Sequence, residues 1–178
     1  MERIALTDSY SISRLIKGGW HLAGGHGAID PIAAIADMAA FAEAGINTFD
    51  CADIYTGVEA LIGEYRRQYP ALAANTRVHT KFVPDLETLS KLKADDITKI
   101  IDRSLQRLGV EQLDLVQFHW WDFNVPGYVE AALQLMRLRQ AGKIAQIGVT
   151  NFDTGHLDRK STRLNSSHVA LSRMPSSA

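Results

Sequence analysis

The sequence predicts a parallel α/β fold. Short runs of apolar and β-branched residues alternate with longer segments in which apolar residues recur every three or four positions. Several of the longer segments are followed by glycine, the residue that most readily ends a helix in a left-handed conformation. Because each helical segment returns the chain to the same end of the next strand, this alternation is typical of a parallel sheet covered by helices.

Composition and charge narrow the class of protein. The chain has 178 residues, 46% of them hydrophobic and 22% charged, which fits one globular domain. Its formal net charge of -1 excludes the strong basic field of nucleic-acid-binding domains, so we expect no nucleic-acid partner. No apolar run reaches the roughly 20 residues that cross a bilayer, and no signal segment opens the chain, so we expect no membrane contact and a cytoplasmic location. The single cysteine, Cys51, excludes an internal disulfide and a cysteine-based metal centre, and we expect no metal site.

The first strand and helix have the clearest boundary signals. A strand is expected over residues 14–20, which end in two glycines and a tryptophan. Asp30 is a typical N-cap, and proline is favoured at the first helical position that follows it. Gly45 is the expected stop of this helix. The apolar residues that recur at helical spacing, and are expected to face the core, are Ile32, Ile35, Met38 and Phe41.

The same alternation continues along the chain. The further expected strands are residues 47–50, 78–82, 113–118 and 143–149. The further expected helices are residues 59–68, about 95–108 and 126–141. Gly109 and Gly142 follow the last two helices directly and predict their ends.

Residues 158–178 differ from the rest of the chain. This segment contains six serines and shows no sustained helical or strand period. Codons for residues 158–168 can be chosen so that they spell a widely used short-read sequencing adapter, and residues 172–178 fit the continuation of that adapter. We therefore predict that residues 1–157 form the native part and that residues 158–178 are a non-native, adapter-derived and disordered tail.

Four polar residues lie at or just beyond the carboxyl ends of different predicted strands: Asp50, Lys81, His119 and Asn151. Each alone is more often a cap, a solvated side chain or a core residue than a catalytic one. In a parallel sheet, however, the carboxyl ends of the strands meet on one face, where the active sites of (β/α)8 barrels are built. The sequence therefore predicts a shared site.

The segment GINTFDCADIY, from Gly45 to Tyr55, resembles the signature of the aldo-keto reductase family, and Glu59 and Gly63 follow it at matching positions. The family's later motifs are matched in order by the Lys81 strand, residues 114–119 and residues 148–152. The resemblance implies a (β/α)8 TIM barrel and reduction of a small carbonyl substrate, usually with NADP(H) and otherwise with NAD(H). Such a barrel typically takes about 250 residues, so the chain would form an incomplete barrel with about the first five βα units.

The resemblance also implies a catalytic tetrad of Asp50, Tyr55, Lys81 and His119. Reduction of a carbonyl needs a proton at oxygen, and Tyr55 would donate it. The Lys81 ammonium would stabilise the phenolate that remains, while Asp50 holds that ammonium in place. His119 would orient the substrate oxygen and stabilise its developing charge.

Further roles are implied for residues around the tetrad. Thr150 and Asn151 would bind the carboxamide of the nicotinamide, and Asp50, Gly19 and Trp20 would also contact the cofactor. The substrate pocket would be lined by Trp20, Trp120 and Trp121, for which packing in the core or at the barrel rim is the alternative.

Strands six to eight of the family's barrel, and with them its main cofactor anchor, have no counterpart in residues 1–157, so we expect this chain by itself to turn over little or no substrate. Two other classes of function stay open. One is a Schiff-base lyase that uses Lys81 as nucleophile, and the other is a non-catalytic regulatory or binding member of the family. The sequence leaves the oligomeric state open.

Overall fold

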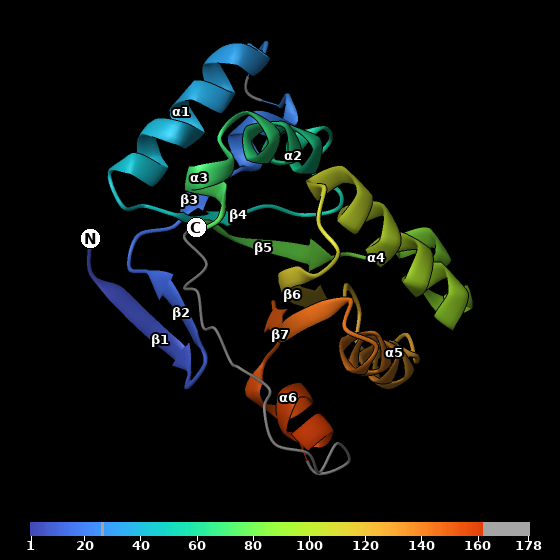
Figure 1. Cartoon of the computed structure of the whole chain (residues 1–178). Coiled ribbons are helices and arrows are strands. Elements are labelled where there is room, and N and C mark those ends of the chain that lie inside the picture. Colours follow the sequence, from blue (N-terminus) through green and yellow to red (C-terminus); the bar gives the residue numbers. More distant parts are fainter. Residues whose placement is uncertain (26, 162–178) are drawn as a thin grey trace.

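The computed structural model describes residues 1–25 and 27–161, and these form a five-stranded parallel sheet with helices packed on its outer face (Figure 1). The strands lie side by side in chain order: β3 (Lys17–Gly18), β4 (Thr48–Asp50), β5 (Arg77–Phe82), β6 (Leu113–His119) and β7 (Ile144–Thr150). All four pairings are parallel. The predicted parallel α/β class is therefore confirmed.

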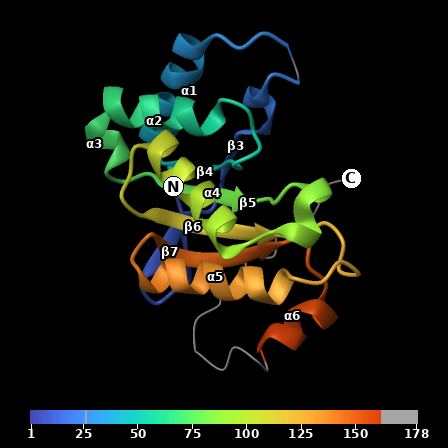
Figure 2. The ribbon, with the colours of Figure 1, turned by 90° about the vertical axis from the view of Figure 1, so that its right-hand side faces the viewer.

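Five helices lie between successive strands, and a sixth follows the last described strand. They are α1 (Pro31–Glu43), α2 (Val58–Gln68), α3 (Pro70–Ala73), α4 (Ala94–Leu108), α5 (Tyr128–Gln140) and α6 (Thr154–Ser161), with short 3-10 turns at Trp20–Ala23 and Leu86–Lys91. Figure 2 shows α4 and α5 running alongside the strands on the outside of the sheet. In the part of the chain described here, no helix is long and apolar enough to cross a membrane.

The first helix shows how local sequence sets the boundaries. The Oδ1 atom of Asp30 accepts hydrogen bonds from the backbone N–H groups of Ile32 and Ala33, at 2.9 and 3.4 Å, and Pro31 is the first helical residue. The prediction that Ile32 faces the core is wrong, because this side chain is 81% exposed. The buried stripe of α1 begins one turn later, at Ala34 and Ile35. The described residues therefore cover α1 from Ala34 onward, but they do not cover the Ile32 side chain in its first turn.

An antiparallel hairpin precedes the sheet, and the sequence analysis did not predict it. It consists of β1 (Arg3–Thr7) and β2 (Tyr10–Ser13). Ser13 and Thr48 exchange two hydrogen bonds between backbone N–H and side-chain hydroxyl, of 3.0 and 3.1 Å, and these attach the hairpin to the start of β4. The strand expected over residues 14–20 is reduced to Lys17–Gly18, since the chain turns into a 3-10 helix at Trp20.

The two faces of the sheet carry side chains that belong to different clusters. Along β6, Val116 and Phe118 join the core beneath the helices, whereas Leu115 belongs to a separate cluster with the hairpin residues Tyr10 and Ile12. Because successive strand residues point to opposite faces, Gln117 and His119 share the inner face with Leu115.

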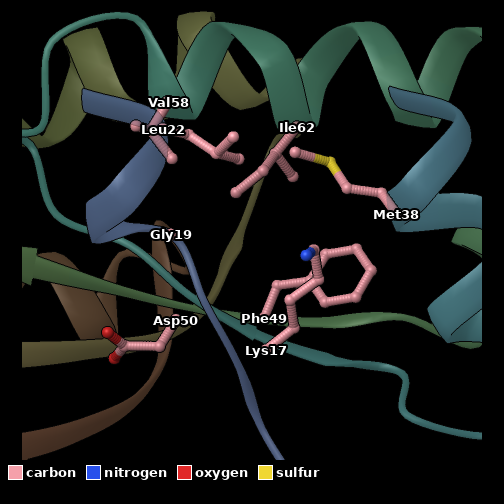
Figure 3. Close-up of a pocket in the computed structure, with 9 residues that line it drawn as sticks. Lys17, Gly19, Leu22, Met38, Phe49, Asp50, Val58 and Ile62 are labelled. Atoms are coloured by element: carbon pink, nitrogen blue, oxygen red, sulfur yellow. The ribbon is translucent and has the colours of Figure 1, made fainter. Parts of the chain in front are cut away.

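The core between the sheet and helices α1 and α2 is nearly filled. A cavity of about 10 Å³, large enough for about one water molecule, lies there among Phe49, Met38, Ile62 and their neighbours. Figure 3 shows the carboxylate of Asp50 extending away from Phe49 and Ile62, so adjacent residues of β4 serve the core and the opposite face.

Helix α6 includes residues 158–161, the first part of the segment predicted to be a non-native tail. The rest of that predicted tail, residues 162–178, lies outside the described residues.

Candidate active site

An ion pair between Asp50 and Lys81 lies at the centre of the site. Asp50 is the last residue of β4, and Lys81 lies near the end of the neighbouring strand β5. The Lys81 Nζ atom donates to Asp50 Oδ2 at 2.6 Å and to the backbone carbonyl of Cys51 at 2.8 Å. The two side chains are only 14% and 22% exposed, so this pair is shielded from water far more than an ordinary surface salt bridge.

Tyr55 lies beside this pair. It follows β4 in a tight turn, in which its backbone N–H donates to the carbonyl of Ala52 at 3.0 Å and its own carbonyl accepts from Val58 at 3.1 Å. The Lys81 Nζ atom is 5.1 Å from the centre of the Tyr55 ring. The ring is half-buried, and the edge of Trp20 packs against it with ring centres 4.9 Å apart. The structure thus brings together a phenol, an ammonium and a carboxylate.

His119 ends β6 on the same inner face. It is 7% exposed and packs edge-to-face against Trp121, with ring centres 4.4 Å apart. Burial, and the nearby positive charge of Lys81, hold the pKa of His119 below its ordinary value. The imidazole is therefore neutral at pH 7 and carries one N–H. Its Nδ1 atom is buried without a hydrogen-bond partner, so the proton is best placed on Nε2, where it can serve as a donor.

Gln117 is a member of the site that the sequence analysis missed. It is 3% exposed and donates from Nε2 to Asp50 Oδ1 at 2.8 Å. The two carboxylate oxygens of Asp50 are therefore occupied separately, one by Gln117 and one by Lys81. The alternation of side chains along β6 could have identified Gln117, because it lies two residues before His119 and so faces the same side.

The residues expected at the nicotinamide end of a cofactor lie at the end of β7. Thr150 pairs in register with His119, and Asn151 follows with a left-handed backbone, φ 58°, which asparagine tolerates better than most residues. A hydroxyl and an amide provide both donors and acceptors, the set that a carboxamide requires. These residues therefore fit a nicotinamide.

The packing of the chain explains why residue 19 is a glycine. Its N–H donates to the carbonyl of Asp50 at 2.8 Å, and a Cβ placed on it would lie 2.9 Å from that same carbonyl and 2.9 Å from Cγ1 of Val58. Any larger residue would push β3 away from β4. The packing of the chain alone therefore requires glycine here, and a cofactor is not needed to explain it.

The three tryptophans of the predicted substrate pocket lie in different environments. Trp20 and Trp121 are 57% and 48% exposed and contact Tyr55 and His119, respectively. The indole N–H of Trp121 is fixed to the carbonyl of Pro84 at 2.7 Å. Trp120 is 1% exposed and packs against Phe118, so its position is that of a core residue, the alternative raised above.

The chain is similar in sequence to several known reductases. A family model described as "Aldo/keto reductase family" matches residues 14–172. A 6-dehydroglucose reductase of Novosphingobium aromaticivorans is 36% identical over 152 residues, 80% of this chain and 48% of that protein. A 6-dehydroglucose reductase of Agrobacterium fabrum is 31% identical over 163 residues, 85% of this chain and 54% of that protein. An NADH-specific methylglyoxal reductase of Escherichia coli is 28% identical over 180 residues, 88% of this chain and 54% of that protein.

Solved structures agree on the fold. An aldo/keto reductase of Brucella melitensis superposes with a TM-score of 0.74 at 25% identity, over 96% of this chain and 60% of that one. An aldo-keto reductase of Bombyx mori in complex with NADP superposes with a TM-score of 0.76 at 22% identity, over 95% of this chain and 56% of that one. The chain spans about half the length of the curated relatives it matches. The predicted incomplete (β/α)8 barrel is therefore confirmed.

Proposed function

Because the chain belongs to the aldo/keto reductase family, we propose that it carries the proton-transfer part of an active site that reduces a small aldehyde or ketone to an alcohol. The cofactor of this reaction is NADP(H), with NAD(H) as the less favoured choice. Tyr55 is the proton donor in this proposal. The observation that carries it is the contact of Lys81 with both the Asp50 carboxylate and the Tyr55 ring.

Reduction of a carbonyl requires a hydride at carbon and a proton at oxygen. A bound nicotinamide cofactor supplies the hydride. Tyr55 gives its phenolic proton to the substrate oxygen, and the Lys81 ammonium, 5.1 Å from the ring centre, stabilises the phenolate that is left. Asp50 and the Cys51 carbonyl keep the ammonium from turning away.

His119 and the edge of β7 complete the arrangement. The Nε2–H group of a neutral His119 donates to the substrate oxygen and stabilises charge that develops there. Thr150 and Asn151 would hold the carboxamide of the cofactor. The exposed rings of Trp20 and Trp121 flank the site and would limit the size of the substrate.

The geometry disfavours a Schiff-base lyase. A lysine nucleophile must be a neutral amine, usually freed by desolvation or by a neighbouring cation. Lys81 instead donates to a carboxylate at 2.6 Å and to a carbonyl at 2.8 Å, and an attacking amine would have to give up these contacts.

The test uses a fusion that completes the barrel. Residues 1–157 are joined to the C-terminal part of the Novosphingobium aromaticivorans relative that the match does not cover. Oxidation of NADPH and NADH is followed with methylglyoxal and with sugar-derived carbonyl compounds. We expect turnover with NADPH in the fusion and little or none in the 178-residue chain.

Tyr55→Phe in the fusion should lower kcat by about 100-fold or more, the usual contribution of a general acid. Tyr69→Phe is the matched control, because Tyr69 packs against Tyr65 away from the site. Equal turnover in the Tyr55→Phe fusion would refute the proposal. Borohydride trapping of substrate at Lys81 would support the lyase, and cofactor binding without any turnover would support a binding role.

We also propose that residues 158–178 are foreign to the native protein and that the protein is cytoplasmic. The adapter-like codons support the first statement, and the buried free thiol of Cys51 suits a reducing compartment. Resequencing of the source DNA across codon 157 tests the boundary directly. The family match extends to residue 172, so a native continuation of the reading frame through these codons would overturn that proposal.

A further inference from the structure

A second group of charged side chains is buried beside the site, and the proposed chemistry does not use it. Glu59, in the first turn of α2, is fully buried, and the Asp53 side chain is 1% exposed. Arg107, near the end of α4, reaches both of these residues. Burying a carboxylate is costly unless partners satisfy it, so the partners of this group identify what it holds together.

Glu59 connects the helix after Tyr55 to the strand that bears Lys81. Its Oε1 atom accepts a hydrogen bond from the hydroxyl of Thr80 at 2.7 Å, and Thr80 is the neighbour of Lys81 on β5. Its Oε2 atom accepts from Arg107 Nη1 at 3.3 Å. Each oxygen of this buried carboxylate therefore has its own donor, on a different element of the fold.

Asp53 connects the segment before Tyr55 to the same strand. Its N–H donates to the carbonyl of Lys81 at 3.3 Å, and its Oδ1 atom accepts from the N–H of Val83 at 3.2 Å. Its own carbonyl accepts from Arg107 Nη1 at 3.0 Å. The backbone is thus fixed two residues before Tyr55 to the two residues that flank Phe82.

Close packing of α2 against α4 places Arg107 within reach. A Cβ on Gly63 would lie 2.1 Å from the carbonyl oxygen of Arg107, so only glycine allows the two helices to approach so closely. From this position a single guanidinium nitrogen spans the turn, because it donates to Asp53 on one side of Tyr55 and to Glu59 on the other.

We propose that Glu59 and Arg107, together with Asp53, position the phenol of Tyr55 relative to Lys81. We call these three residues the Tyr55 clamp. The inference rests on the proposed function for its consequence in catalysis, but the positioning itself is a statement about geometry. None of the three touches the substrate in this proposal, and they are positioning residues rather than catalytic ones.

The physical reason is the weakness of the other restraints on Tyr55. Its ring is half-buried and contacts the exposed Trp20 and the Lys81 ammonium, and the backbone hydrogen bonds of Tyr55 itself join it to Ala52 and Val58 within the same turn. Buried ion pairs contribute little net stability, yet their fixed geometry restricts the groups that they join. A displacement of about 1 Å at a reacting group can lower the rate by about 100-fold.

The test on the 178-residue chain uses a spectroscopic signature of the Tyr55 ring. Tyrosine and tryptophan are labelled selectively, and the Tyr55 signals are assigned by their loss in Tyr55→Phe. In the parent chain we expect a nuclear Overhauser effect between the rings of Trp20 and Tyr55. In Glu59→Gln we expect this effect to be lost, because glutamine places an amide N–H₂ where Arg107 or Thr80 needs an acceptor.

Two further variants make the experiment decisive. Arg107→Lys keeps the charge and the aliphatic chain at a side chain that is 39% exposed, but a lysine cannot reproduce the guanidinium contacts, so it should weaken the same signal in a folded chain. Asp102→Asn is the matched control: it removes an ion pair of α4 with Lys143, of 2.5 Å, on the exposed side of that helix. The control should leave the Tyr55 signals unchanged.

The outcomes separate this proposal from the proposed function. Unchanged Tyr55 signals in a folded Glu59→Gln or Arg107→Lys chain overturn the clamp, whatever the activity. If the signals change while the completed barrel has no turnover, the clamp stands and the reductase assignment fails. If both hold, Glu59→Gln in the completed barrel should lower kcat by about 100-fold with little change in KM, because the Tyr55 proton is misplaced while binding is kept.

Discussion

Replacement of Asp53 by asparagine should change how the stability of this chain depends on pH. Burial, and the nearby negative charge of Glu59, raise the pKa of Asp53 from 3.8 to about 7. Its Oδ1 atom accepts from the N–H of Val83, which an asparagine oxygen can also do. The variant therefore keeps this hydrogen bond, while it removes the ionisation and with it the ion pair to Arg103 at 3.9 Å.

The direction of this pH dependence follows from the proton affinities of the folded and unfolded states. The folded state holds the Asp53 proton more tightly than the unfolded chain, so the stability that this group contributes is present at low pH and is lost as pH rises towards 7. Since a tenfold difference in proton affinity is worth about 1.4 kcal/mol, the parent chain should lose roughly 2 to 3 kcal/mol from this group between pH 5 and pH 8. Asparagine loses none of it.

His79 acts in the opposite direction and masks the effect in the parent chain. Burial lowers its pKa from 6.5 to about 4, so the folded state resists its protonation and stability is lost as pH falls below 6.5. Between pH 8 and pH 5 this costs about 2 kcal/mol, which nearly cancels the Asp53 contribution. His119, whose pKa burial also lowers, acts in the same direction as His79. We therefore expect the stability of Asp53→Asn to rise more steeply with pH than that of the parent chain.

Urea denaturation followed by circular dichroism at pH 5, 6, 7 and 8 measures both profiles. Asp102→Asn serves as control, since the Asp102 side chain is 47% exposed. The stability of Asp53→Asn relative to the parent chain should increase by roughly 2 to 3 kcal/mol from pH 5 to pH 8, and that of the control should stay constant. Parallel profiles for the variant and the parent chain would show that Asp53 does not titrate as its burial implies.

Three other substitutions or probes test the packing. Gly63→Ala should force α2 and α4 apart, because its Cβ would lie 2.1 Å from the Arg107 carbonyl, and should cost about 1 to 3 kcal/mol in a urea titration; an unchanged midpoint would contradict the close approach. Cys51 is fully buried and burial raises its pKa, so its thiol should react with Ellman's reagent only after urea is added; rapid reaction of the native chain would be inconsistent with that burial. Asp30→Ala should cost about 1 kcal/mol by loss of the N-cap, and the comparison with Glu43→Ala at an exposed position of α1 isolates that loss.

The sequence predicted four helices, α1, α2, α4 and α5, and four of the five parallel strands closely, because both are encoded locally. The short helices α3 and α6 were not predicted. Asp30 and Pro31 start α1, and Gly109, with φ 65°, ends α4 as expected. The hairpin was missed because its partners are distant: Ser13 bonds to Thr48, and Tyr10 bonds to His79 at 3.0 Å. Ile32 was misplaced because helical spacing gives the face of a helix but not the length over which neighbours cover it.

In the site, too, the sequence indicates some residues directly, whereas the contacts of others join positions far apart in the chain. Asp50, Lys81 and His119 could be found because they stand at strand ends, whose meeting place follows from parallel order alone. Trp120 and Trp121 could have been separated by the two-residue alternation from His119, which places Trp120 on the opposite face. Gln117 and Glu59 form their contacts with residues 67 and 48 positions away, and nothing near them in the sequence indicates those partners.

The groups proposed for proton transfer depend on a smaller part of the fold than the residues proposed to bind the cofactor. Asp50, Lys81 and Gln117 come from β4, β5 and β6, which are neighbours in the sheet and pair in register. Their geometry is therefore fixed by pairings within residues 48–119. Thr150 and Asn151 lie at the end of β7, which is an edge strand among the described residues. Cofactor binding should thus respond to whatever pairs with β7, whereas the alignment of Tyr55 with Lys81 should not.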